Sequence, residues 1–322
     1  MRAIVLAAHG GPDALRLEER PAPSPSEGEI VVENQFCGVN FIDLYQRKGL
    51  YPVALPVVLG CEGAGRVVAV GAGVSGFRVG DRAVYLSTGG GYAEQTAVAA
   101  WRAAPLPAAI GADIAAASFL KGLTAEMLLR QVYPVARGAK ALVYAAAGGV
   151  GTILTQWAAL LGAEVIAVVG NDEKAAAARR LGAAHAIVRT KTESISAAVR
   201  DVTGGAGVDV VYDSVGAATF ADSLDSLAPR GMMVSYGNAS GPVPSIAPLE
   251  LGRRGSLFLT RPSLFHYATP ERFAGMASAL FDLMESGRIR VDPPATFRLD
   301  EAGAAQAKLE SASTMGSLAL KP

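Results

Sequence analysis

Cysteine is scarce in this chain, because Cys37 and Cys61 are the only two among 322 residues. Two cysteines are too few for a disulfide-stabilised scaffold or for a structural zinc site with four cysteine ligands. So few cysteines, without partners that suggest pairing, are typical of proteins in a reducing compartment. We therefore expect a cytoplasmic protein that is stabilised by its core and not by cross-links.

Charge is also low, since charged residues make up 18% of the chain and the formal net charge is +0. Proteins that bind nucleic acid usually carry a basic surface that neutralises phosphates, so a nucleic-acid partner is not expected. Hydrophobic residues, in contrast, make up 51% of the chain. This excess fits buried parallel strands, which are continuous apolar runs.

One charge-free stretch, residues 141–163, is long enough and apolar enough to suggest a membrane span. It is interrupted by Gly148, Gly149 and Gly151, so a strand, a glycine turn and a buried helix explain it better. The apolar run at residues 3–6 is too short for the core of a signal peptide, and no cleavage pattern follows it. We expect neither a secretory leader nor a membrane partner.

The spacing of apolar segments and of glycine and proline divides the chain into three sections. Residues 1–122 are typical of a β-rich domain, with strands expected near 30–39, 65–70, 82–85 and 92–98 and a short helix capped by Asn40 that ends before Gly49. Residues 263–322 are mixed, with helices expected at 271–286 and 300–311 and a strand at 317–320.

The middle section, residues 123–262, alternates short apolar strands with helices. Strands are expected at 141–145, 164–169, 186–188, 208–213, 232–236 and 257–260, with helices that begin near Gly149, Asp172, Glu193 and Ala218. This alternation predicts a parallel sheet with helices on both faces. The sequence therefore predicts an α/β fold in which an α/β unit is inserted into a β-rich domain.

A glycine-rich turn follows the first of these strands. Residues 142–151 read LVYAAAGGVG, which fits a dinucleotide fingerprint with Ala146 in place of the first glycine. Small residues let the backbone approach a pyrophosphate, and the helix that follows offers it free N–H groups. A tight turn that binds nothing is the alternative, but the strand before and the helix after favour dinucleotide binding.

The end of the second strand bears on which dinucleotide binds. Residues 168–171 read VVGN and offer no carboxylate to a ribose hydroxyl, whereas Lys174 follows on the next helix. This combination favours the 2′-phosphate of NADPH. In the alternative, Lys174 is an ordinary surface lysine and Asp172 holds the ribose of NAD.

Ten segments together are similar to one family, the quinone oxidoreductase (zeta-crystallin-like) branch of the medium-chain dehydrogenase/reductase superfamily. They are residues 9–12 (HGGP), 38–43 (GVNFID), 49–52 (GLYP), 60–65 (GCEGAG), 80–85 (GDRAVY), 117–124 (ASFLKGLT), 145–151 (AAAGGVG), 212–216 (YDSVG), 235–238 (SYGN) and 260–264 (TRPSL). The resemblance implies a GroES-like catalytic domain at 1–122 and 263–322, a Rossmann NADPH-binding domain at 123–262, reduction of quinones by NADPH, and a homodimer.

The resemblance also implies the residues of the site. The catalytic residues would be Asn40, Asp43, Tyr45 and Tyr51. The cofactor-binding residues would be Phe41, Ile42, Thr124, Met127, Gly148, Gly149, Val150, Gly170, Asn171, Lys174, Arg189, Val215, Gly237, Asn238, Thr260 and Arg261. Two positions depart from the family: Arg189 stands where relatives usually have tyrosine, and Ala312 stands where they often have arginine.

A zinc ion is not expected. Zinc-dependent members of the superfamily have a cysteine and a histidine where this chain has Asn40 and Cys61, and they carry a cysteine-rich lobe that is missing here. Without a Lewis acid, an ordinary ketone is a poor acceptor, whereas a quinone yields a resonance-stabilised phenolate. Hydrogen bonds from Tyr45, Tyr51 or Asn40 could suffice, although both tyrosines could simply pack in the cleft wall.

Two other functions remain open at this point. A conjugated enone or alkenal also spreads its negative charge, so an NADPH-dependent double-bond reductase is the main rival. A non-catalytic structural protein that binds NADPH or RNA is a rival of another class.

Whatever the function, we expect the homodimer to form through residues 256–260 (SLFLT). This apolar segment is the expected edge of the sheet, and it has no proline or charge that would prevent pairing with a second copy.

Overall fold

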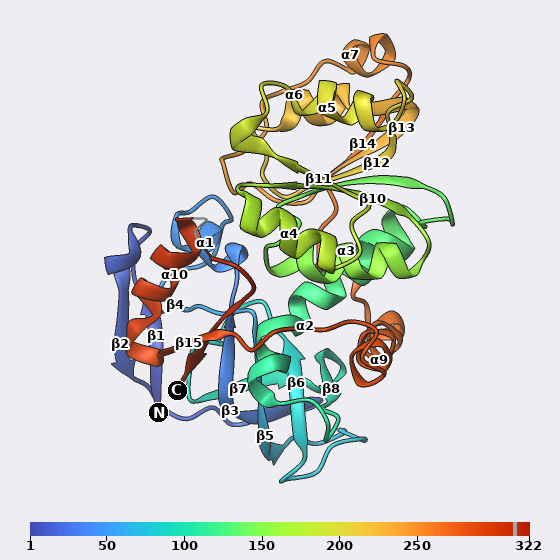
Figure 1. Cartoon of the computed structure of the whole chain (residues 1–322). Helices are drawn as coiled ribbons and strands as arrows, with labels where there is room; N and C mark the ends of the chain where they lie inside the picture. The colour runs from blue at the N-terminus through green and yellow to red at the C-terminus, as the bar shows by residue number, and fades with distance from the viewer. Residues whose placement is uncertain (312–313) are drawn as a thin grey trace. The chain divides into compact units, whose positions relative to one another are not determined.

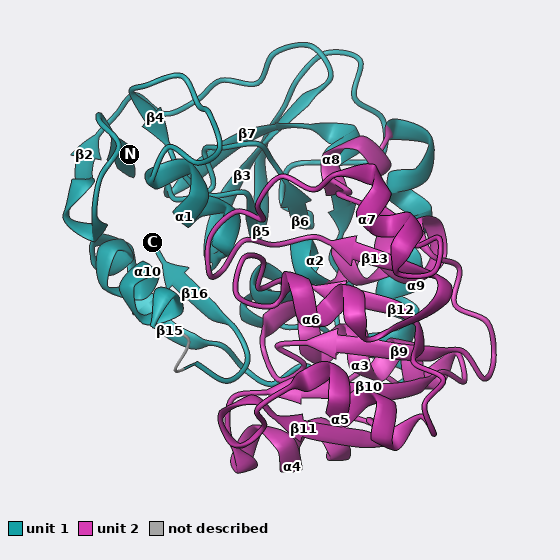
Figure 2. Ribbon diagram, turned by 90° about the horizontal axis from the view of Figure 1, so that it is seen from above, with its two compact units in different colours: residues 1–121, 270–287, 291–322 teal, residues 122–269, 288–290 magenta. Residues whose placement is uncertain are grey.

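The computed structural model describes residues 1–311 and 314–322, which form two compact units (Figure 2). The first unit comprises residues 1–121, 270–287 and 291–322, and the second comprises 122–269 and 288–290. Residues 263–269, which we expected in the first domain, belong to the second unit. The reason is that α8 (Leu264–Tyr267) packs against the π-helical segment η3 (Met127–Val132) and buries Leu264.

The second unit contains one six-stranded parallel sheet with the strand order β11-β10-β9-β12-β13-β14. Its strands are β9 (Lys140–Tyr144), β10 (Glu164–Val169), β11 (His185–Val188), β12 (Val208–Asp213), β13 (Leu227–Ser235) and β14 (Phe258–Thr260). The order reverses direction between β9 and β12, which is the doubly wound Rossmann arrangement. The predicted parallel sheet is confirmed.

Helices cover both faces of this sheet. In Figure 1, α5 (Ile195–Val202) and α6 (Phe220–Asp225) lie on one face, and α3 (Gly149–Leu160) and α4 (Asp172–Arg180) lie on the other. The remaining elements of this unit are η4 (Arg189–Lys191) and α7 (Pro248–Arg253). The apolar strand runs supply the core, in which Leu142, Ile166 and Val211 are fully buried. Residues 141–163 become the end of a strand, a turn and a helix, as predicted.

The first unit is built from two sheets. The larger has the order β15-β16-β3-β5-β6-β8, with β7 also paired to β3, and the smaller has the order β2-β1-β4. Its strands are β1 (Arg2–Leu6), β2 (Leu15–Glu19), β3 (Glu29–Val39), β4 (Val57–Val58), β5 (Glu62–Val70), β6 (Arg82–Leu86), β7 (Gln95–Ala99), β8 (Ala103–Pro105), β15 (Ala295–Arg298) and β16 (Leu318–Lys321). Its helical segments are η1 (Pro12–Ala14), α1 (Phe41–Arg47), η2 (Ala100–Arg102), α9 (Pro270–Glu285), η5 (Leu299–Glu301) and α10 (Ala302–Glu310).

The C-terminal segment completes the first unit. β16 pairs antiparallel with β3, so residues near 318 and residues near 39 lie side by side. This pairing accounts for a β-rich domain assembled from both ends of the chain. In the described part of the chain, no helix is both long enough and apolar enough to cross a membrane.

One long helix was not predicted. α2 (Ala112–Glu126) begins in the first unit, ends in the second and continues directly into η3. Its residues are apolar on nearly every side, so it lacks the amphipathic stripe by which a surface helix is recognised. Burial of Phe119, Leu123 and Ala125, and not any periodic pattern, stabilises it.

Candidate functional site

The glycine-rich turn lies where β9 meets α3. Gly148 is the N-cap of α3, and Gly149 and Val150 form its first turn. A Cβ at Gly151 would lie 2.1 Å from the carbonyl oxygen of Ala145, so only glycine lets the helix approach the strand this closely. Ala145 has φ 50°, an uncommon left-handed conformation of the kind that clusters at binding sites. The turn therefore has the geometry that a pyrophosphate site requires.

The neighbouring strand ends carry the predicted adenosine-phosphate residues. Val169 of β10 is paired with Val188 of β11, which places the segments after them side by side. Asn171 caps α4, and its Oδ1 accepts a hydrogen bond from the Lys174 backbone nitrogen at 2.9 Å. Arg189 begins η4 in the neighbouring segment and is exposed.

Two further contacts join these segments, and the sequence reasoning missed both. The Thr190 hydroxyl donates to the carbonyl oxygen of Gly170 at 3.0 Å, and Lys191 Nζ pairs with Asp172 Oδ2 at 2.5 Å. Asp172, the alternative ribose ligand, is thus engaged by a lysine. Two carboxylates, Asp172 and Glu173, lie in the first turn of α4. The basic residue Lys174 follows them in α4, and Arg189 and Lys191 belong to η4.

The ends of β12 and β13 form a pair of interlocked loops. The buried carboxylate of Asp213 accepts hydrogen bonds from the backbone nitrogens of Val215 (2.7 Å) and Gly216 (3.0 Å). Its other oxygen accepts from the hydroxyls of Thr219 (2.7 Å) and Ser223 (2.8 Å). Asp213, which sequence reasoning did not single out, therefore fixes the loop that carries the predicted cofactor residue Val215.

The second of these loops holds Gly237 and Asn238. A Cβ at Gly237 would lie 2.3 Å from the carbonyl oxygen of Ser214, so the two loops touch where glycine stands. Arg261, just after β14, donates to the carbonyl oxygens of Ser235 (2.7 Å) and Gly237 (3.3 Å). Arg261 thus holds this loop in place through these hydrogen bonds, and Thr260 is the last residue of the edge strand β14. The structure brings all four predicted residues of this region together with Val215.

Thr124 and Met127 lie next to each other where α2 passes into η3. Both are buried, with relative exposures of 8% and 1%. The tighter α-helix changes to a wider π-helix at Met127, and π-helical turns occur often at functional sites. The Tyr212 hydroxyl donates to the carbonyl oxygen of Leu128 at 3.4 Å, which ties this segment to the central strand β12.

The predicted catalytic residues cluster on and beside α1 in the first unit. Tyr45 and Tyr51 meet edge to face with ring centroids 5.1 Å apart, and Phe41 lies 6.0 Å from the Tyr45 ring. The Tyr51 backbone nitrogen also donates to the carbonyl oxygen of Tyr45 at 3.1 Å. Ile42 follows Phe41 in the first turn of the helix. Phe41, Tyr45 and Tyr51 thus form an aromatic cluster on and beside α1.

Asn40 is the N-cap of α1, as predicted, and forms a capping box with Asp43, but its side chain also has a partner that the sequence did not suggest. Its Nδ2 donates to Glu62 Oε1 at 2.7 Å, and Glu62 also pairs with Lys121 Nζ at 3.2 Å. Asn40 and Glu62 are 5% and 0% exposed. The amide of Asn40 is therefore held by a carboxylate instead of serving the helix start alone.

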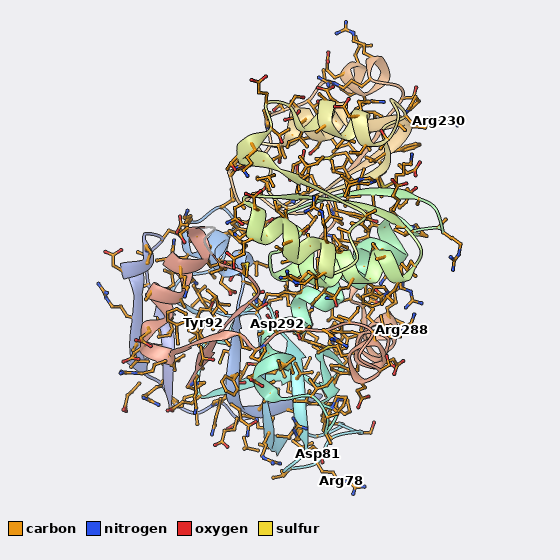
Figure 3. The ribbon with its side chains drawn as sticks, in the orientation of Figure 1. Arg78, Asp81, Tyr92, Arg230, Arg288 and Asp292 are labelled. Carbon is orange, nitrogen blue, oxygen red and sulfur yellow. The ribbon has the colours of Figure 1, made fainter. Side chains whose placement is uncertain are left out.

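Asp43 is fully buried and bonded within the first unit, and its predicted place among the catalytic residues stays a prediction. Its Oδ2 accepts from the Asn40 backbone nitrogen and from the Tyr92 hydroxyl, each at 2.8 Å (Tyr92 is labelled in Figure 3). Burial raises the pKa of Asp43 to about 7, although these two hydrogen bonds work against the shift. In the structure, Asp43 fixes the start of α1 and its link to Tyr92.

The buried Asp43 predicts a dependence of stability on pH. The folded state keeps the Asp43 proton up to about pH 7, whereas the unfolded chain releases it near pH 4. Between these values the folded state binds more protons, so stability from this residue is lost as pH rises, by at most about 1.4 kcal/mol per unit. Asp43→Asn removes the titration, and we expect its stability relative to wild type to rise from pH 4 to 7 and to level off above. Parallel pH curves of denaturant unfolding for the two proteins would contradict this.

The described residues do not fit a zinc ion. Among residues 1–311 and 314–322, no group of three His, Cys, Asp or Glu side chains could hold a metal. Asn40 is bonded to Glu62, and burial together with the nearby Asp43 raises the pKa of the Cys61 thiol well above its ordinary value. Zinc binds the thiolate, which this environment disfavours.

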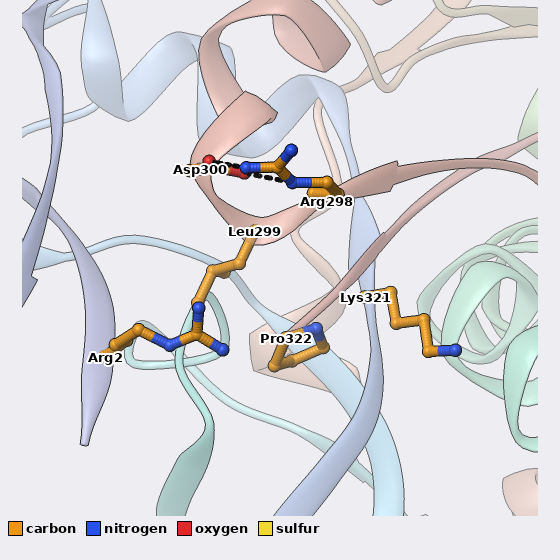
Figure 4. A pocket seen from close by; sticks show the side chains of 6 residues that line it. All are labelled: Arg2, Arg298, Leu299, Asp300, Lys321 and Pro322. Atoms are coloured by element: carbon orange, nitrogen blue, oxygen red, sulfur yellow. Dashed lines mark hydrogen bonds and ion pairs between the residues drawn. The ribbon is translucent and has the colours of Figure 1, made fainter.

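A pocket of about 220 Å³ in the first unit is lined by none of the predicted site residues (Figure 4). Its lining is Arg2, Arg298, Leu299, Asp300, Lys321 and Pro322. Arg298 pairs with Asp300 within the pocket, and Arg2 pairs with Glu94 at 2.7 Å, so the two guanidinium groups already have carboxylate partners. We assign this pocket no role.

Several residues of the site have only weak signals in the sequence. Glu62, Lys121 and Tyr92 are polar residues beside apolar segments, and Asp213 is a carboxylate at the end of an apolar strand. An acidic residue at either end of a buried strand must find partners, and this signal could have identified Asp213, which ends β12, and Glu62, which begins β5. Ala312, where the family often has arginine, lies outside the described residues.

Comparison with known proteins agrees with this arrangement. Residues 26–108 match the family described as "Alcohol dehydrogenase GroES-like domain", and residues 149–283 match "Zinc-binding dehydrogenase". A quinone oxidoreductase of Salmonella typhimurium is 49% identical over 98% of this chain and 97% of that protein, and one of Pseudomonas aeruginosa is 46% identical over 100% and 99%. The structure of an Escherichia coli quinone oxidoreductase complexed with NADPH matches all of both chains, with 45% identity and a TM-score of 0.97. The chain therefore belongs to the quinone oxidoreductase branch of the medium-chain dehydrogenase/reductase superfamily.

Proposed function

We propose that this protein is an NADPH-dependent quinone reductase that works without a metal ion. The observation that carries the proposal is the corner of the Rossmann sheet formed by the turn at Gly148, the start of α4 and the segment η4. It combines the glycine turn with the cations Lys174 and Arg189. Residues 169–171 (VGN), at the end of β10, offer no carboxylate. Family membership and the NADPH complex of the Escherichia coli relative support the same conclusion.

The cofactor residues divide by the part of NADPH that they would contact. Backbone N–H groups of Gly149 and Val150, at the start of α3, would hold the pyrophosphate. Gly170, Asn171, Lys174 and Arg189 would hold the adenosine 2′-phosphate. Phe41, Ile42, Thr124, Met127, Val215, Gly237, Asn238, Thr260 and Arg261 would hold or support the nicotinamide end, and for Arg261 the observed bonds favour a supporting role.

When bound, NADPH supplies the hydride or electrons that reduce the quinone. The protein's part is to orient the acceptor and to stabilise the charge that develops on its oxygen. Tyr45 and Tyr51 stand edge to face, and each has a hydroxyl that could donate to such an oxygen. Asn40 adds an amide held in a fixed direction. A metal-assisted general acid is not needed, because the phenolate that forms from the quinone is stabilised by resonance.

A substrate panel tests the proposal. NADPH oxidation is measured with benzoquinones and naphthoquinones, with conjugated enones and alkenals, and with saturated aldehydes, before and after dialysis against a strong chelator. We expect quinones to be reduced fastest and the chelator to have no effect. Faster turnover of enones, loss of activity with the chelator, or tight NADPH binding without turnover of any acceptor would each contradict a different part of the proposal.

We also propose a homodimer formed through β14. This strand is the edge of the six-stranded sheet, and the side chain of Phe258 is 57% exposed on it. An unguarded apolar edge pairs readily with its own copy, which would satisfy the open backbone groups. The zero net charge supports the further proposal that neither nucleic acid nor membrane is a partner, and the two buried free cysteines fit a cytoplasmic location.

Replacement of Phe258 tests the dimer. We expect light scattering at micromolar concentration to give twice the chain mass for wild type and a shift toward the monomer for Phe258→Glu, because a charge would be buried beside its copy. Val79, which is 67% exposed in the first unit, offers a matched control. Val79→Glu should leave the mass unchanged. A wild-type monomer, or a Phe258→Glu variant as dimeric as wild type, would refute the assignment of this edge.

A further inference from the structure

Glu62 is a buried carboxylate to which the proposed chemistry assigns no task. We infer that Glu62 and Lys121 are positioning residues, which hold the Asn40 amide in one orientation for quinone reduction. The inference rests on the proposed function. Oε1 of Glu62 accepts from Asn40 Nδ2 at 2.7 Å and from Lys121 Nζ at 3.2 Å, and Oε2 accepts from the backbone nitrogen of Leu120 at 2.6 Å.

The pairing of β3 with β5 and the close approach of α2 bring Glu62 into contact with Asn40 and Lys121. Glu62 begins β5 beside the end of β3, where Cys37 pairs with Gly63. A Cβ at Gly38 would lie 2.3 Å from Glu62 Oε1 and 2.0 Å from the carbonyl oxygen of Ala116 in α2. The missing side chain of Gly38 therefore makes room for Glu62 to reach α1 on one side and α2 on the other. A carboxylate in this place serves the contact between three elements.

The consequence for Asn40 is directional. One N–H of its amide is committed to Glu62, which restricts the orientations that the amide can adopt. Donation to an ionised partner is stronger than a neutral hydrogen bond and polarises the amide. A group held in this way loses little conformational entropy when it adopts the geometry that the reaction needs. A misplaced group, in contrast, can lower the rate about a hundredfold.

Lys121 is the ion-pair partner of the Glu62 carboxylate. It is 6% exposed, so the pair is almost completely shielded from water, and removal of one partner would leave the other buried alone. The other titratable groups that face Glu62 are Asp43 on α1, Cys61 beside it on the chain and Tyr85 on β6, and none of them supplies a positive charge. Lys121 is thus the only cation in this set.

Three variants test the inference through kcat and the KM for NADPH. In Glu62→Gln, either orientation of the new amide turns an N–H against a donor, Asn40 and Lys121 on one side or Leu120 on the other. We expect kcat to fall about 10- to 100-fold while KM for NADPH changes less than about twofold. Lys121→Met should lower kcat in the same way, because Glu62 loses its ion-pair partner, and Lys121→Arg should restore most of the wild-type kcat.

Glu126→Gln is the matched control, since Glu126, which lies in α2, is also a buried carboxylate but pairs with Arg130 and Gln131. It should keep the wild-type kcat even if its melting temperature falls. Circular dichroism checks the fold of each variant, and if Glu62→Gln does not fold, the contrast between Lys121→Met and Lys121→Arg decides. Active wild type with unchanged kcat in these variants would overturn the inference alone. Wild type without quinone turnover would overturn the proposed function and the inference with it.

Discussion

Lys174→Ala is expected to raise the KM for NADPH and to leave the kinetics with NADH nearly unchanged. NADH lacks the 2′-phosphate that Lys174 is proposed to bind at the start of α4. A well-formed charge-assisted hydrogen bond contributes roughly 1.5–3 kcal/mol, and two of them, reduced by solvent, correspond to a preference for NADPH of about ten- to a thousandfold in kcat/KM. Arg189→Ala should act in the same direction with a smaller effect. Steady-state kinetics with both cofactors measure the ratio.

The pair of Lys191 and Asp172 sharpens this test. Their contact at 2.5 Å neutralises the carboxylate that would otherwise repel a phosphate and attract a ribose hydroxyl. Both side chains are more than 60% exposed, so the effect should be smaller than that of Lys174. Lys191→Gln should lower the preference for NADPH, and Asp172→Asn introduced with it should restore much of that preference. Equal use of NADPH and NADH by wild type, or an equal loss with both cofactors in Lys174→Ala, would contradict the phosphate site.

Gly151→Ala is expected to abolish tight NADPH binding and to lower stability. The new Cβ would lie 2.1 Å from the carbonyl oxygen of Ala145 and 2.8 Å from the Cα of Ala146, and both are backbone atoms that cannot turn aside. Helix α3 must move away from β9, which displaces the N–H groups proposed to hold the pyrophosphate. Overpacking of this kind costs about 1–3 kcal/mol. Fluorescence titration with NADPH and thermal unfolding measure the two effects.

Gly252→Ala provides the control for this variant. Gly252 lies in α7 of the same unit, and a Cβ there would meet nothing within 4 Å. Alanine favours the helix by up to about 1 kcal/mol over glycine, so stability should be unchanged or slightly higher and NADPH binding unaffected. A Gly151→Ala protein that binds NADPH as tightly as Gly252→Ala would show that the close approach of α3 is not needed for the cofactor.

The sequence alone determined the features that depend on neighbouring residues. The six strands of the Rossmann sheet, the glycine turn and the helix after it follow from apolar runs of strand length and from residues that only a tight turn requires. The lack of a carboxylate after Val169 is equally local. Strands β2, β4, β8 and β15 were missed because they are short or half-exposed, so that their patterns resemble those of loops. Strand β1 was missed as well, although its apolar residues are buried.

The tertiary structure alone decided which polar groups meet inside the fold. Asn40 and Glu62 are 22 residues apart, Glu62 and Lys121 are 59 apart, and Asp43 and Tyr92 are 49 apart. No local pattern links such residues; antiparallel pairing of β3 with β5 and the packing of α2 bring the first three together. Burial then makes each unpaired polar atom costly, so the partners become fixed only when the chain has closed around them. For the same reason, Asp43 could be named from its motif, but its place as a buried support of α1 followed only from the fold.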